Sequence, residues 1–68
     1  MRYAVLIERA EGTWAAHVPD LPGCEAAGAT PTEARERVRQ ALRLHVAGLQ
    51  EDGDPVPQPT AVADYVEV

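Results

Sequence analysis

Hydrophobic positions along this chain follow two periods, one typical of strands and one typical of a helix. Four stretches are rich in β-forming residues and read as strands: residues 3–9, 13–18, 24–27 and 61–68. Gly12 lies in the short connection between the first two stretches, which predicts a hairpin. The sequence therefore predicts three antiparallel strands in succession and a fourth strand after a long gap.

A single helix is predicted in that gap, at about residues 31–51. Thr30 is a suitable N-cap, and Pro31 occupies the first helical position, where its missing N–H costs nothing. Glu33 completes a capping box, and Gly53 suits the position after the helix end. Apolar positions then recur with a period of 3.6 residues. This predicted stripe consists of Ala34, Val38, Ala41, Leu42, His45 and Leu49.

The element order β-β-β-α-β predicts a single α+β domain covering residues 1–68. A right-handed crossover would place the fourth strand beside the first, which gives one four-stranded mixed sheet with spatial order 3-2-1-4. One helix covers one face of this sheet. The first strand is apolar on both faces, and a domain of 68 residues has a marginal core. We therefore expect a homodimer or a higher homo-oligomer.

Charge and composition exclude several classes of protein. The net charge is −5, from eleven acidic and six basic residues, so direct DNA binding is not expected. There is no apolar run of the ~20 residues that span a membrane, and no signal peptide, so we expect a cytoplasmic protein.

Arg35, Arg39 and Arg43 form a basic ridge on the helix together with Arg37. The ridge either binds RNA phosphates or is a solvated face that pairs with nearby glutamates.

Prolines and glycines concentrate in the stretch after the second strand, where they predict a stiff turn. The turn and the following helix start form a motif with a specific spacing, made of Pro19, Asp20, Leu21, Pro22, Gly23, Cys24, Gly28, Thr30, Glu33 and Ala34. With this motif, nearly the whole chain resembles the N-terminal domain of the HicB-like antitoxin family.

The resemblance implies a partially degraded ribonuclease H fold and a role without catalysis. Members of this family usually pair with HicA, a small toxin that cleaves mRNA, and cover its active site. Many also carry a C-terminal DNA-binding domain. This chain reaches Val68 without one, so operator binding is not expected of it. The resemblance implies no cofactor.

Several residues have both a chemical and a structural interpretation. Glu8, Asp20, Glu25 and Asp64 are the carboxylates that a two-metal nuclease would need, although nothing in the sequence forces them together. Asp20 is more simply a turn residue whose side chain accepts backbone N–H bonds.

Four other side chains also have both a chemical and a structural interpretation. His17 and His45 would supply only two ligands of a metal site, and partly buried, hydrogen-bonded histidines are more common. Cys24 lacks the context of a nucleophile and reads as a small buried residue. Trp14 is either an anchor for a partner or a core residue.

The leading hypothesis is a binding protein that neutralises a HicA-like toxin, with partner contacts at Trp14, Glu25 and Asp64 and neither metal nor catalytic residues. One alternative is a small oligomeric binding protein with no toxin partner. The other is a metal-dependent nuclease related to ribonuclease H.

Overall fold

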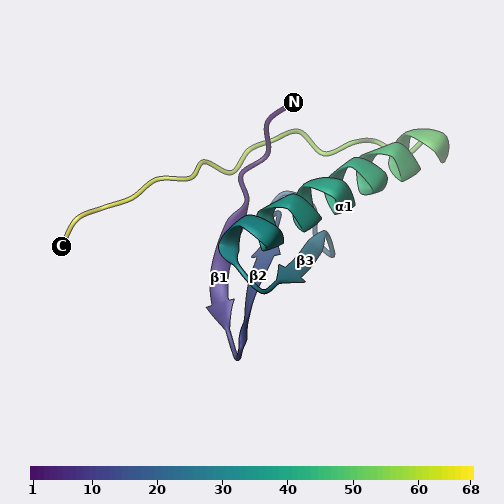
Figure 1. Ribbon diagram of the computed structural model, residues 1–68. Helices are drawn as coiled ribbons and strands as arrows, with labels where there is room; N and C mark the ends of the chain where they lie inside the picture. The colour runs from purple at the N-terminus through teal and green to yellow at the C-terminus, as the bar shows by residue number, and fades with distance from the viewer.

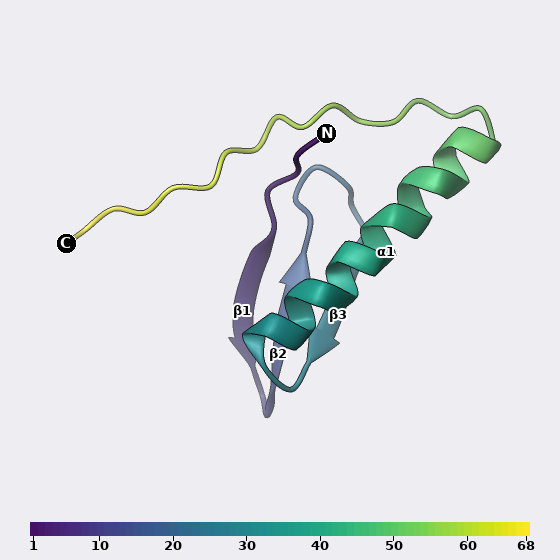
Figure 2. The same cartoon turned by 45° about the horizontal axis from the view of Figure 1, so that its top comes forward.

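A three-stranded antiparallel sheet and one long helix form the fold, which the computed structural model describes for all of residues 1–68 (Figure 1). The elements are β1 (Leu6–Ala10), β2 (Thr13–His17), β3 (Glu25–Gly28) and α1 (Pro31–Glu51). The strands lie in the order β1-β2-β3, and α1 crosses one face of the sheet (Figure 2). The predicted meander of three strands and the predicted helix limits are confirmed.

Two tight connections set the register of the sheet. Gly12 has a φ of 67° and lies in the two-residue turn that joins β1 to β2, where Ala10 pairs with Thr13. The second connection, residues 18–24, contains two consecutive turns that are closed by hydrogen bonds from the Leu21 N–H to the Val18 carbonyl and from the Cys24 N–H to the Leu21 carbonyl, each 3.0 Å long. The predicted stiff turn is therefore present.

The residues of this second turn also build the core. Pro19 and Pro22 stand at the second position of each turn, and Gly23 has a φ of 86°, as the third position of a type II turn requires. The side chains between them point inward, because Val18, Leu21 and Cys24 are all at least 97% buried. The turn therefore closes the hydrophobic core at one end of the sheet.

The helix begins as its sequence predicts. The Thr30 hydroxyl accepts a hydrogen bond from the Glu33 N–H at 3.1 Å. The Glu33 carboxylate accepts a hydrogen bond from the N–H of Ala29, whereas in the predicted capping box it would accept from the N–H of Thr30. Both bonds satisfy donors near the helix N-terminus.

The helix ends in a Schellman motif around Gly53, which has a φ of 72°. Its N–H donates to the Gln50 carbonyl at 3.2 Å, and the Asp54 N–H donates to the Leu49 carbonyl at 2.8 Å. The expected role of Gly53 is confirmed.

The core lies between α1 and the sheet. Its fully buried members are Ala16, Val18, Leu21, Cys24, Ala34 and Val38. The predicted helix stripe is confirmed at most positions, but Val46 packs against the core where His45 was expected. The helix thus contributes from Ala34 to Leu49, a little over four turns at about 3.6 residues per turn. Leu44, which lies off this stripe, is 76% exposed.

The predicted fourth strand is wrong, and with it the four-stranded sheet of order 3-2-1-4. Residues 61–68, here called the arm, form no strand and leave the sheet (Figures 1 and 2). Three alternating prolines, at positions 55, 57 and 59, keep the preceding chain extended and remove backbone donors. No backbone–backbone hydrogen bond involves residues 55–68. The structure therefore has the element order β-β-β-α and lacks the four-stranded sheet that the expected order β-β-β-α-β predicted.

Candidate partner-binding surfaces

The side chain of Asp20 holds the start of the arm. Its carboxylate accepts hydrogen bonds from the Thr60 N–H at 3.0 Å, the Thr60 hydroxyl at 2.7 Å and the Ala61 N–H at 3.0 Å. We call this arrangement the clasp. The second turn of the sheet thus reaches a segment forty residues further along the chain.

The clasp changes the acidity of Asp20. The Thr60 hydroxyl, followed by the two backbone N–H groups, lowers the pKa of the Asp20 carboxyl below its ordinary value. Donors of this kind favour the charged carboxylate, and Asp20 is ionised while it holds the arm. The expectation that Asp20 accepts backbone N–H bonds is confirmed, but the donors come from a distant segment rather than from the turn itself.

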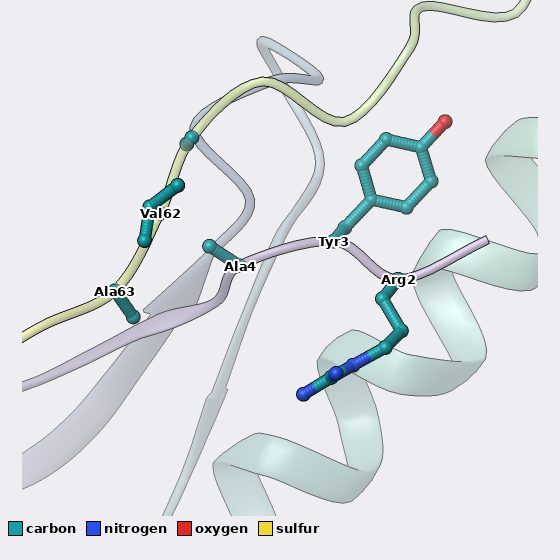
Figure 3. A pocket seen from close by; sticks show the side chains of 6 residues that line it. Arg2, Tyr3, Ala4, Val62 and Ala63 are labelled. Atoms are coloured by element: carbon teal, nitrogen blue, oxygen red, sulfur yellow. The ribbon is translucent and has the colours of Figure 1, made fainter.

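Past the clasp, the arm crosses the N-terminal segment, residues 1–5. A hollow of about 340 Å³ lies at this crossing, lined by Arg2, Tyr3, Ala4, Ala61, Val62 and Ala63. Figure 3 shows Ala63 close to the N-terminal segment near Ala4, with Tyr3 and Arg2 pointing to different sides of it. The Tyr3 hydroxyl donates to the Pro57 carbonyl. Beyond Ala63 the arm forms no hydrogen bond to the rest of the chain. The side chains of Val62, Tyr65 and Val66 are each more than 85% exposed.

A groove separates the N-terminal segment and β1 from α1. It consists of two adjoining hollows of about 480 and 450 Å³. The groove exists because α1 packs mainly over β3 and least over β1. Its lining comprises Met1, Arg2, Tyr3, Val5, Ile7, Arg35, Val38, Arg39, Leu42, Arg43, Val46, Ala47 and Gln50.

The groove combines an apolar floor with a basic rim. Arg35 and Arg39 share the exposed carboxylate of Glu36, at 3.6 and 3.5 Å, and such surface pairs are weak. Arg2 and Arg43 form no ion pair. The rim therefore keeps uncompensated positive charge on a chain whose net charge is −5.

The sheet face opposite α1 has a different character, and we call it the open face. Side chains alternate along each strand, so the neighbours of the core residues Ile7, Ala16 and Ala26 point away from the helix. These outward residues are Leu6, Glu8, Ala15, His17, Glu25 and Ala27, with Ala15 opposite Ala27 and His17 opposite Glu25. A hollow of about 420 Å³ adjoins the paired alanines. The face carries small side chains and the carboxylates of Glu8 and Glu25, and Leu6 on it is 45% exposed.

The four carboxylates of the nuclease hypothesis lie on different elements. Glu8 is on β1, Glu25 on β3 and Asp64 on the arm, while Asp20 is occupied by the clasp. No three histidine, cysteine, aspartate or glutamate side chains gather into a group that could hold a metal ion. His17 lies on the open face and His45 on α1, so the sheet separates the two imidazoles.

Cys24 and Trp14 both belong to the packed interior or its margin. Cys24 is 3% exposed, and burial raises the pKa of its thiol. Trp14 faces the helix side of β2 and packs against the core, with the Arg9 guanidinium 5.6 Å from the centre of its ring. The three expected partner contacts, Trp14, Glu25 and Asp64, therefore lie on the helix side, the open face and the arm.

The basic ridge of α1 is divided among several partners. Arg37 pairs with Glu33 at 3.1 Å and donates to the Ala27 carbonyl at 2.9 Å. Arg35 and Arg39 pair with Glu36, so the pairing expected for a solvated helix face is present.

No helix of the protein has the length and apolar character needed to cross a membrane.

Comparison with known proteins decides the family. Residues 3–68 match the family model described as "HicB_like antitoxin of bacterial toxin-antitoxin system". The chain belongs to this family. The match includes the stiff turn, the clasp, the helix and the arm, and it omits only Met1 and Arg2, which contribute to the lining of the hollows beside the N-terminal segment.

Relatives of the HicB-like chain include a phage protein and archaeal proteins. An uncharacterised 14.9 kDa protein from the rep-hol intergenic region of Haemophilus phage HP1 is 33% identical over 97% of the chain. The chain spans half the length of that relative. A UPF0150 protein of Thermoplasma acidophilum is 34% identical over 90% of both chains, and one of Archaeoglobus fulgidus is 37% identical over 79% of this chain and 83% of its own. No solved structure matches.

Two features of these surfaces escaped prediction from the sequence. Thr60 is a hydrogen-bond partner of Asp20, and no local pattern around it signals a contact with a residue forty positions away. The groove depends on where α1 settles across the sheet, which periodicity does not specify. The prolines before Thr60 are the one signal that the following segment does not simply return to the sheet.

Proposed function

We propose that this chain is the antitoxin of a HicA/HicB-type pair and neutralises a small RNA-cleaving toxin by covering it, without catalysis of its own. The observation that carries this proposal is the family match over residues 3–68. It acts in the cytoplasm, where the toxin meets mRNA.

The open face is the proposed contact surface. Its paired alanines, Ala15 and Ala27, let a partner backbone approach closely, and Leu6 offers an apolar anchor. Glu8 and Glu25 add negative charge, and neither forms an ion pair within the chain. A protein that binds RNA presents a basic surface, so opposite charges would steer the encounter and apolar contacts would set its lifetime.

Of the three residues expected to contact the toxin, this proposal keeps only the one on the open face. Glu25 lies on the open face, whereas Trp14 faces the helix side and Asp64 lies on the arm. The proposed toxin contact therefore centres on Glu25 with Glu8 and Leu6.

Growth rescue in a bacterial host tests the proposal. The HicA-like protein encoded beside this chain in its native genome is expressed from an inducible promoter, with or without the chain. Co-expression should restore growth. The variant Glu8→Arg/Glu25→Arg should bind the toxin at least tenfold more weakly, a loss of about 1.4 kcal/mol in binding free energy. It should therefore fail to rescue growth.

The matched control is Glu51→Arg, which reverses a charge at the far end of α1 and should rescue as well as the parent chain. If the parent chain does not rescue growth although it accumulates in folded form, the antitoxin proposal is wrong. If both variants rescue equally, the toxin binds elsewhere.

A further inference from the structure

The chain leaves one strand edge and one strand-like segment without partners. β1 is an edge strand, and no hydrogen bond reaches it from outside its hairpin. The arm is extended and β-prone, and between Val62 and Val68 its only hydrogen bond is the one from the Tyr65 N–H to the Asp64 carboxylate. Unpaired edges and exposed β-prone segments readily pair with other chains.

The other edge of the sheet is protected. The Arg37 guanidinium on α1 donates to the Ala27 carbonyl of β3 at 2.9 Å, so the helix already uses an acceptor on that strand. The helix also packs closely over β3 and leaves β1 comparatively uncovered. The free edge of β1, with the groove beside it, is thus the place where an added strand fits.

The arm matches this place in length, pattern and charge. From Val62 to Val68 it spans roughly 23 Å when extended, more than the five residues of β1 require. Every second side chain shares a face, so Val62, Asp64 and Val66 point one way. Valines suit the apolar floor of the groove, and a carboxylate between them suits its arginine rim.

We propose that the arm of one copy of this chain pairs as a strand with the free edge of β1 in a second copy and fills that copy's groove. The arm cannot serve its own groove in this conformation, because after the clasp it runs away from its own sheet (Figures 1 and 2). Exchange of both arms gives a closed twofold dimer, in which each copy satisfies the edge of the other. This inference does not depend on a toxin.

Opposite charge reversals test the exchange. Arg39 lines both halves of the groove, so Asp64→Arg and Arg39→Glu each place like charges together in a homodimer. By analytical ultracentrifugation the parent chain should be a dimer. Each variant should have a dimer dissociation constant raised about tenfold or more. An equimolar mixture of the two variants should recover parental affinity, because both interfaces of the mixed dimer pair Asp or Glu with Arg.

Two further variants probe the apolar contact. Val66→Asp should also weaken the dimer, whereas Leu44→Asp, at an exposed apolar position on the outer side of α1, should not. Circular dichroism must show parental helix content for every variant compared. A monomeric parent chain, a dimer insensitive to all three arm and groove variants, or a mixture that stays as weak as its components would each overturn the proposal.

Discussion

Gly28 lies where β3 meets the first turn of α1. A methyl group at this position would stand 2.6 Å from the backbone nitrogen of Ala34 and 2.9 Å from the carbonyl carbon of Glu33. Both neighbours are backbone atoms of the capped helix start, so neither can rotate away. The closeness of sheet and helix therefore depends on the absence of a side chain at this one residue.

Gly28→Ala should lower the free energy of unfolding by roughly 2 to 3 kcal/mol. Gly48→Ala is the matched control, because nothing lies within 4 Å of its added methyl group and alanine favours the helix. It should raise the free energy of unfolding by about 0.5 to 1 kcal/mol. Urea denaturation followed by circular dichroism measures both. Equal effects of the two substitutions would contradict the close approach.

Cys24 should resist thiol reagents while the protein is folded. Its side chain is almost fully buried, and its raised pKa keeps the thiol protonated at neutral pH. Reaction with a disulfide reagent at pH 7.5 should be slow in buffer and fast in denaturant. Rapid labelling of the native protein would show that the turn opens easily and would reopen the nucleophile interpretation.

At the level of elements, the sequence predicts what depends on local chemistry. The helix limits follow from Thr30, Pro31 and Gly53, whose roles are fixed by the few residues around them. The meander follows from short connections. The fourth strand fails because its pairing depends on a distant edge, and the clasp at Asp20 directs the chain past that edge.

The N-cap of α1 offers an element-scale prediction. Thr30→Ala removes the hydroxyl that accepts the Glu33 N–H, which should cost about 1 kcal/mol of unfolding free energy. Thr32→Ala, an exposed change in the same turn, should cost much less. Thermal denaturation of both variants tests this. A loss for Thr32→Ala as large as that for Thr30→Ala would argue against the cap.

Acid should release the arm from the clasp. The folded-state pKa of Asp20 is lowered, so the clasp contributes stability above the unfolded pKa and loses it as the pH falls through the folded value. NMR signals of the Thr60 and Ala61 amides should therefore shift together with the Asp20 carboxyl during an acid titration.

Thr60→Val removes the donor with the largest effect and should raise the pKa of Asp20 toward its ordinary value. Gln58→Ala, on the same segment but without contact to Asp20, should leave the titration unchanged. An Asp20 carboxyl that titrates normally in the parent chain would show that the clasp does not persist in solution.

At the scale of the whole molecule, three surfaces differ in charge and apolar character. The open face is acidic, the groove is apolar with a basic rim, and the arm is apolar with acidic positions. The sequence indicates the family and the overall acidity, but not this division, because it arises from how α1 and the arm lie relative to the sheet. The two proposals assign the open face to a basic partner and the groove to the arm of a second copy.

The most direct test of the central claim is a titration of toxin activity with purified components. The HicA-like protein cleaves a labelled RNA, and increasing amounts of this chain are added in the presence of Mg²⁺. Cleavage should stop near one chain per toxin, Glu8→Arg/Glu25→Arg should need at least tenfold more protein, and the chain alone should leave the RNA intact. Undiminished cleavage at a large excess of folded chain, or cleavage by the chain itself, would contradict the account.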